Sequence, residues 1–192
     1  VFDHTTDVLK ALKEKEVTPE WVQIGNEIRD GMLWPDGRAT KNPRFLAELI
    51  NEGHRAAKAI DQGIKVIVHL DSGHDKKLFR WFFDLMETHG ARYDVIGLSC
   101  YPFWAKEEDG RKHVVTRLGE NLVELAARYH KEVMVVEVGG ESAKPAETKT
   151  MLDEVMRLTR AVPGNKGLGV IYWEPQGARI WSGYKLSCWN DD

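Results

Sequence analysis

The sequence has little of several features that mark particular classes of protein. Its 192 residues include only two cysteines, Cys100 and Cys188, which are too few for a disulfide scaffold or a zinc knuckle. No apolar run approaches the roughly 18 to 20 residues of a membrane-spanning helix, and residues 1–10 lack the basic and apolar stretches of a signal peptide. No glycine-rich phosphate-binding motif is present, which disfavours nucleotide chemistry.

The charge is also close to balanced. The 27 Lys and Arg against 30 Asp and Glu give a net charge of -3, which disfavours nucleic acid or an anionic membrane as the partner. Hydrophobic residues make up 42% of the chain, enough for a sizeable core, and no linker or low-complexity segment divides it. We therefore expect residues 1–192 to form one domain. Seven tryptophans exceed ordinary core needs and point to a binding surface.

Five short apolar runs predict buried strands, because they are rich in Val and Ile and nearly continuous in apolarity. They are Trp21–Glu27, Lys65–Asp71, Asp94–Tyr101, Val133–Gly139 and Gly169–Pro175. Helical patterns precede and separate them at Thr6–Glu16, Pro43–Gln62, Lys76–Thr88, Thr116–His130 and Ala146–Arg160. Strands that alternate with helices in this way predict an α/β fold with a parallel sheet.

The spacing of these strands suggests a larger architecture. They recur about every 37 residues, and a (β/α)8 barrel of such units needs roughly 290 residues. The chain is therefore either a five-stranded open sheet or the C-terminal five units, strands 4 to 8, of a (β/α)8 TIM barrel. An open sheet leaves unpaired edges that invite association with other chains, so we expect the barrel, with roughly 110 residues before Val1.

Two carboxylates lie where parallel α/β folds place their ligands, at the carboxyl ends of strands. Glu27 ends the first run, and Glu137 lies near the end of the otherwise apolar run Val133–Gly139. Two carboxyls across a cleft can cleave a glycosidic bond, one protonating the leaving oxygen while the other attacks. The alternative is a solvated strand end for Glu27 and a buried ion pair for Glu137. A retaining mechanism predicts carboxyl oxygens about 5 to 5.5 Å apart.

Aromatic side chains follow the same strand ends and suit the flat apolar faces of sugars. They are Trp34, Tyr101, Phe103, Trp104 and Trp173, with Trp181 just beyond. Core packing is the alternative, but Trp34 and Trp104 sit beside Pro, Gly or charged residues. The segment His69–Asp75 contains potential metal ligands, yet short His and Asp clusters in loops are permissive, and we predict no metal. We expect His69 to point into the cleft instead.

Several runs together resemble a known family. They are Trp21–Ile28, Gly31–Gly37, Val66–Leu70, Asp94–Trp104, Val135–Glu137 and Gly169–Pro175, in this order along the chain. The runs Gln23-Ile24-Gly25-Asn26-Glu27 and Gly97-Leu98-Ser99-Cys100-Tyr101-Pro102-Phe103-Trp104 are the most specific. The sequence resembles the endo-β-1,4-galactanases of glycoside hydrolase family 53.

The resemblance implies a retaining hydrolase of the TIM-barrel clan that needs no cofactor and acts on galactan or type I arabinogalactan. By resemblance, Glu27 is the acid/base and Glu137 the nucleophile. The resemblance also implies roles for the residues around the substrate. Asn26 would hydrogen-bond the 2-hydroxyl of the sugar being cleaved, and Tyr101 would orient Glu137. Trp173 would form the floor of the central subsite, and the cleft would be lined by His69, Trp34 and Trp104. It further implies a secreted, periplasmic or cell-surface protein.

The sequence also departs from the family pattern. Cys100 stands where the family usually has Tyr, and Val138-Gly139-Gly140 follows Glu137 where a Thr or Ser and an aromatic are common. The segment Gly140–Gly167 is short beside the family's long loops. These departures leave two alternatives open: another β-glycanase of the same clan, and a non-catalytic carbohydrate-binding protein.

Overall fold

The computed structural model describes residues 1–105, 108–177 and 179–189, and of residues 108–112 and 179 it describes the backbone alone. By their contacts these residues form two compact units. The first comprises Val1–Leu70 and Lys77–Ile96, and the second comprises Asp71–Lys76 and Gly97–Asp192.

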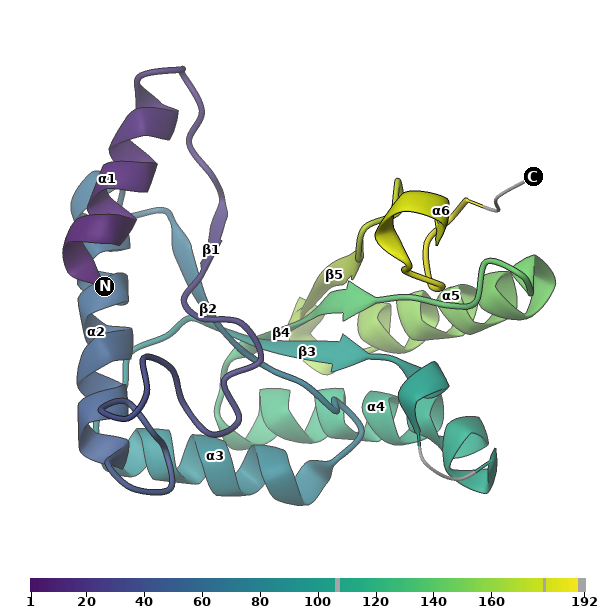
Figure 1. Ribbon diagram of the computed structural model, residues 1–192. Coiled ribbons are helices and arrows are strands. Elements are labelled where there is room, and N and C mark those ends of the chain that lie inside the picture. The colour runs from purple at the N-terminus through teal and green to yellow at the C-terminus, as the bar shows by residue number, and fades with distance from the viewer. Residues whose placement is uncertain (106–107, 178, 190–192) are drawn as a thin grey trace. The chain divides into compact units, whose positions relative to one another are not determined.

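Helices and strands alternate along the whole chain (Figure 1). The strands are β1 (Trp21–Gln23), β2 (Lys65–Leu70), β3 (Val95–Cys100), β4 (Glu132–Val138) and β5 (Gly167–Tyr172). The α-helices are α1 (Phe2–Lys13), α2 (Pro43–Ile60), α3 (Lys76–Thr88), α4 (Glu108–Arg128), α5 (Pro145–Arg160) and α6 (Arg179–Ser182), with 3-10 turns η1 (Pro102–Trp104) and η2 (Pro163–Asn165). The strands follow one another in the sheet in chain order, and β1 with β2 and β4 with β5 pair in parallel. The parallel sheet predicted from the apolar runs is therefore confirmed.

The first unit is held by an apolar core in which helices pack on β1 and β2. Leu9 of α1, Ala57 of α2 and Val66 of β2 are buried together. Ile24, just after β1, and Ile64, just before β2, complete this core. The long helix α2 begins with a proline at its first turn, a position where the missing N–H costs nothing. Its buried small residues let it lie close against α1 and β2 (Figure 1).

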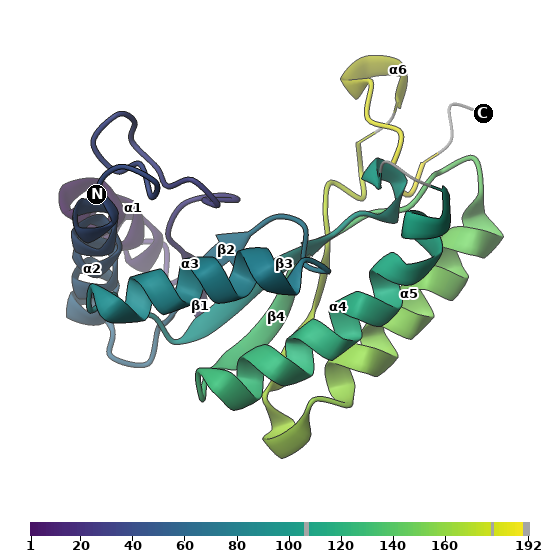
Figure 2. The same ribbon diagram turned by 90° about the horizontal axis from the view of Figure 1, so that it is seen from below.

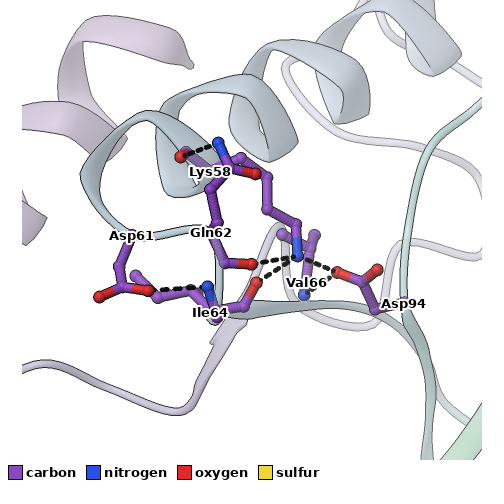
Figure 3. A network of polar contacts seen from close by, with 7 residues as sticks. Lys58, Asp61, Gln62, Ile64, Val66 and Asp94 are labelled. Carbon is purple, nitrogen blue, oxygen red and sulfur yellow. Dashed lines mark hydrogen bonds and ion pairs between the residues drawn. The ribbon is translucent and has the colours of Figure 1, made fainter.

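A polar network closes the amino-terminal end of β2 (Figure 3). The Lys58 ammonium of α2 donates to the carbonyl oxygen of Ile64 at 2.6 Å and pairs with the Asp94 carboxylate at 3.0 Å. The same carboxylate accepts the backbone N–H of Val66 at 2.8 Å. Burial alone would raise the pKa of Asp94, but the Val66 N–H and the Lys58 ammonium outweigh it and hold that pKa below its usual value. The network fixes the start of β2 to the end of α2.

In the second unit, α4 and α5 lie side by side against β4, and α5 also contacts β5 (Figure 2). The residues of β4 from Val133 to Val138 are all buried, as expected for a strand covered on both faces. The two helices approach closely at Gly119, where an added Cβ would lie 2.7 Å from the Leu158 side chain. The absence of a side chain at this position thus sets the distance between α4 and α5.

The outer strands differ from the central ones in burial. All six residues of β3 are buried, whereas β5 is only half-buried and its Ile171 is 47% exposed. The short β1 is likewise half-buried or exposed. Among the described residues, no helix combines the length and apolarity that a membrane crossing would require.

Some boundaries differ from those predicted. β1 ends at Gln23 rather than at Glu27, because the chain turns at Gly25 and Glu27, which both have positive φ. α1 runs from Phe2 to Lys13 rather than from Thr6 to Glu16, and α4 starts at Glu108, eight residues before Thr116. The predicted single domain over residues 1–192 stays a prediction.

Candidate active site

Glu27 lies in the loop after β1 and is anchored to the neighbouring strand β2. Its backbone N–H donates to Nδ1 of His69 at 3.5 Å, and the N–H of Ile28 donates to the His69 carbonyl oxygen at 3.0 Å. Glu27 has φ +47 and is half-buried, so it follows a tight turn rather than the strand pleat. His69 is fully buried. Because its Nδ1 accepts, a neutral His69 carries its proton on Nε2.

Asn26, next to Glu27, is exposed at the carboxyl end of β1. Its side-chain oxygen accepts a hydrogen bond from the Gln23 amide at 3.3 Å. An exposed amide beside a half-buried carboxyl provides donors and acceptors to a ligand with many hydroxyls. The first unit therefore places Asn26 and Glu27 in the loop after β1 and brings the Glu27 backbone to His69 of β2, while the roles predicted for these residues stay predictions.

The loop that follows is organised around Asp30. Its carboxylate accepts from Nε of Arg38 at 2.7 Å and from the N–H of Thr40 at 3.0 Å. Its carbonyl oxygen accepts from the Trp34 indole N–H at 2.9 Å and from the N–H of Ala39 at 3.1 Å. Burial would raise the pKa of Asp30, but the hydrogen bonds from Thr40 and Arg38 prevail and lower it.

Trp34 is held by this loop with much of its ring in solvent. The Arg38 guanidinium lies over the ring, 4.3 Å from its centroid, and 58% of Trp34 remains exposed. The loop can double back because Gly31 has φ +88, and a Cβ there would fall 1.8 Å from the carbonyl oxygen of Gly37. A tryptophan with one face stacked and the rest exposed is a platform for a flat ligand.

In the second unit, Glu137 is the sixth residue of β4 and is only 6% exposed. The Tyr101 hydroxyl donates to its Oε2 at 2.9 Å. Burial, and then the negative charge of Glu137, raise the pKa of Tyr101 well above its usual value. Tyr101 therefore stays protonated and remains a donor. The hydrogen bond from Tyr101 restricts the orientation of this almost buried carboxylate, and the role of Glu137 as nucleophile stays a prediction.

Aromatic side chains surround this carboxyl end of the second unit. Trp104, in η1, is 63% exposed and contacts Phe103 edge to face at 4.6 Å. Trp173 directly follows β5; its backbone N–H donates to the carbonyl oxygen of Val138 at 2.9 Å, and 42% of it is exposed. Trp181, on α6, is 69% exposed. These exposed rings fit sugar stacking better than core packing.

Cys100 stands beside Tyr101 at the end of β3 and is buried and free. Burial raises the pKa of its thiol to about 12, so it is not a nucleophile at ordinary pH. Cys188 is also free but exposed. Taken one at a time, neither unit brings ligand atoms of three His, Cys, Asp or Glu residues to within 4.8 Å of one another among the residues that the structure describes. The absence of a metal stays a prediction.

Some residues of the site could not be recognised from the sequence. Asp30 and Arg38 lie in a polar loop without a distinctive pattern, and their importance emerges from four contacts to one aspartate. Tyr184 lies after α6, 47 positions beyond Glu137, and its ring reaches back to Gly139. The glycine pair Gly139-Gly140 was the one available signal, because a missing side chain after a buried carboxylate leaves space for something else.

Comparison with known proteins identifies the family. The sequence model of glycosyl hydrolase family 53 matches residues 1–190 of this chain. The chain is 31% identical to an arabinogalactan endo-β-1,4-galactanase of Cellvibrio japonicus, over 91% of this chain and 51% of that protein. It is 32% identical to a probable arabinogalactan endo-β-1,4-galactanase A of Aspergillus terreus, over 91% of this chain and 55% of that one. It thus spans about half the length of these relatives.

Solved structures agree with this match. A structure from a study of two fungal β-1,4-galactanases superposes with a TM-score of 0.83 at 25% identity, covering 97% of this chain and 61% of that one. The GH53 catalytic domain of Ignisphaera aggregans superposes with a TM-score of 0.81 at 25% identity, covering 96% of this chain and 56% of that one. The catalytic core of xylanase A superposes with a TM-score of 0.60 at 13% identity, and this similarity shows the fold alone.

These similarities confirm the predicted fold, five consecutive βα units of a (β/α)8 barrel. The family matched over nearly the whole chain is also the one that the sequence motifs indicate. The chain belongs to glycosyl hydrolase family 53.

Proposed function

We propose that the protein is a retaining endo-β-1,4-galactanase that cleaves galactan or type I arabinogalactan. Membership of family 53 and the names of the relatives support this activity. The observation that carries the proposal is the almost buried Glu137 carboxylate with the Tyr101 hydroxyl at 2.9 Å. A carboxylate held in this way can be an oriented nucleophile but cannot serve as a solvated surface charge.

In the proposed reaction Glu137 attacks the anomeric carbon of the bound galactosyl unit. Glu27 donates a proton to the leaving glycosidic oxygen, so the C–O bond breaks without releasing a free alkoxide. The resulting galactosyl ester of Glu137 is then hydrolysed by water, which Glu27 deprotonates in turn. The anomeric configuration is retained because two displacements take place.

Other residues bind and orient the sugar in this proposal. Asn26 hydrogen-bonds the 2-hydroxyl of the sugar being cleaved, where contacts tighten in the transition state. Trp173, Trp34 and Trp104 offer ring faces to successive sugar units, and their exposure suits that role. His69 contributes a hydrogen-bonding group beside Glu27. We also propose an extracellular, periplasmic or cell-surface location, because a polymeric substrate does not cross a membrane unaided.

The direct test is turnover by the full-length protein, with linear β-1,4-galactan as substrate and β-1,4-xylan and β-1,4-mannan as controls. Release of short galactose oligomers from galactan alone is expected, and NMR of the first products should show retained anomeric configuration. Preferred cleavage of xylan or mannan would replace galactan by another β-glycan. Binding to galactan without any turnover would identify a carbohydrate-binding protein instead.

The division of labour predicts different responses from two conservative variants. Glu137→Gln should abolish turnover of every substrate, since no covalent ester can form. Glu27→Gln should lower kcat on galactan by about 10²- to 10⁴-fold, the usual contribution of a general acid. It should spare formation of the glycosyl-enzyme from an aryl galactoside whose leaving group needs no proton. Burst kinetics would separate the two steps, and equal losses on both substrates would contradict the assignment of Glu27.

A further inference from the structure

The hydroxyl of Tyr184 is an unusual feature of the second unit. The residue lies just after α6, its hydroxyl oxygen is shielded from solvent, and it has no hydrogen-bond partner among the described residues. Buried hydroxyls almost always have hydrogen-bond partners, because a hydroxyl without one loses its hydrogen bonds to water and gains none in return. A buried donor left unpaired is therefore a candidate functional group.

The position of this hydroxyl depends on Gly139, two residues after Glu137. A Cβ built on Gly139 would lie 2.8 Å from the Tyr184 hydroxyl oxygen, too close for any real contact. The same Cβ would be 3.1 Å from the Leu186 carbonyl oxygen. The tyrosine tip is the more movable of the two, so any side chain at 139 would displace it. The glycine thus makes the space that the hydroxyl occupies.

The neighbour towards which Tyr184 can donate is Tyr101. The single hydroxyl hydrogen of Tyr101 is directed to Glu137 at 2.9 Å, so its oxygen is left as an acceptor. The two tyrosines interact, although their geometry in this structure falls short of a hydrogen bond. A shift of the Tyr184 hydroxyl towards the Tyr101 oxygen would form one, and the two hydroxyls would then make a chain of donors that ends on the carboxylate.

The Tyr184 hydroxyl stays protonated at the pH values at which such a chain of hydrogen bonds would act. Burial raises the pKa of Tyr184 to about 12, the interaction with Tyr101 opposes this rise, and the negative charges of Tyr172, Glu137 and Glu174 add to it. A hydroxyl that stays protonated remains a hydrogen-bond donor. Polarising the Tyr101 hydroxyl in this way favours the ionised form of the carboxylate that it contacts.

We propose that Tyr184 is a positioning residue for the nucleophile, donating to Tyr101 and through it stabilising the Glu137 carboxylate, in space provided by Gly139. This inference rests on the proposed function for the role of Glu137. It adds a contribution from the segment after the last strand, paired with a glycine at which this chain departs from the family pattern.

The test uses Tyr184→Phe in the full-length protein, with two independent readouts. Titration of the Glu137 carboxyl carbon by ¹³C NMR should show a higher midpoint in the variant than in the unchanged protein. The acidic limb of the kcat/KM profile on galactan should move to higher pH in parallel. The loss of one relayed hydrogen bond should lower kcat by about threefold to tenfold with KM unchanged.

A second variant makes the test specific. Gly139→Ala should displace the tyrosine tip and shift the Glu137 midpoint in the same direction. In the double variant with Tyr184→Phe, the alanine should cause no additional shift, because the hydroxyl it would displace is gone. Tyr129→Phe, which removes a hydroxyl at the far end of α4, is the matched control and should leave both readouts unchanged.

An unchanged Glu137 midpoint in Tyr184→Phe would overturn the inference. So would a Gly139→Ala shift of full size in the double variant. Failure of the proposed function would look different: the unchanged protein would not hydrolyse galactan, while the NMR titration would still show whether Tyr184 acts on Glu137.

Discussion

At the scale of single residues, Asp30 organises the loop that carries Trp34. Its carboxylate binds Arg38 and Thr40, and its carbonyl oxygen binds the Trp34 indole at 2.9 Å. Arg38 in turn covers one side of the Trp34 ring. A sugar that stacks on Trp34 therefore meets a ring already fixed in place, and little order has to be created on binding.

This fixation predicts graded effects on substrate affinity. Trp34→Ala should raise KM for galactan about 2- to 10-fold, the usual value of one aromatic stacking contact, with a smaller effect on kcat. Asp30→Asn should raise KM in the same direction but less, because the ring remains and only its support is lost. Asp36→Asn, on the same loop and exposed, is the control. An unchanged KM in Trp34→Ala, measured on oligomers of increasing length, would remove this ring from the cleft.

Some site residues can be predicted from sequence because they stand beside apolar runs. Glu137 and Tyr101 follow buried strands, and parallel strands end at a common edge. Tyr184 cannot be found in this way. Its approach to Gly139 depends on how the segment after β5 folds back, which no periodic pattern encodes.

At the scale of elements, the strands are predictable and their ends are less so. β2 and β3 match the expected runs to within one residue at each end, since continuous Val and Ile favour strands covered on both faces. β1 ends four residues early although Ile24 and Ile28 continue the apolar pattern. Both are buried after the chain has left the strand, so apolarity here marks the core rather than pleated backbone.

The start of α4 was missed for a different reason. Its first turns, Glu108–His113, are charged and include a glycine, so they show no apolar stripe. The buried positions that reveal the helix, among them Val114 and Leu118, come later. Helical turns that no core residue marks are not detectable from hydrophobic periodicity.

The network at the start of β2 predicts a pH-dependent stability (Figure 3). The pKa of Asp94 is lowered in the folded state, so its contribution is fully present above the unfolded value of about 4 and is lost as the pH falls through the folded value. Asp94→Asn should lower the free energy of unfolding by about 1.5 to 3 kcal/mol at pH 7, as for hydrogen bonds to a charged group. Urea unfolding at pH 7 and pH 3 would measure it. The variant should lose less stability than the unchanged protein on acidification, and an equal loss would contradict this role.

At the scale of the whole molecule, the retaining mechanism makes a geometric prediction. In a crystal structure of the full-length protein, the carboxyl oxygens of Glu27 and Glu137 should lie about 5 to 5.5 Å apart. That distance lets the nucleophile reach the anomeric carbon without an intervening water. A separation above about 8 Å in an intact cleft would indicate inversion instead.

The loop around Asp30 has a consequence for how such enzymes diversify. Every contact described for Trp34 comes from within residues 30–40, so the support of the ring is local in sequence. Glu27, the proposed acid/base, is fixed separately, by β2. The loop therefore holds the ring by its own contacts, while Met32 and Gly37 pack it against the rest of the first unit. Exchanging residues 30–40 between barrels, by evolution or by protein engineering, should alter which sugars bind and leave Glu27 in place.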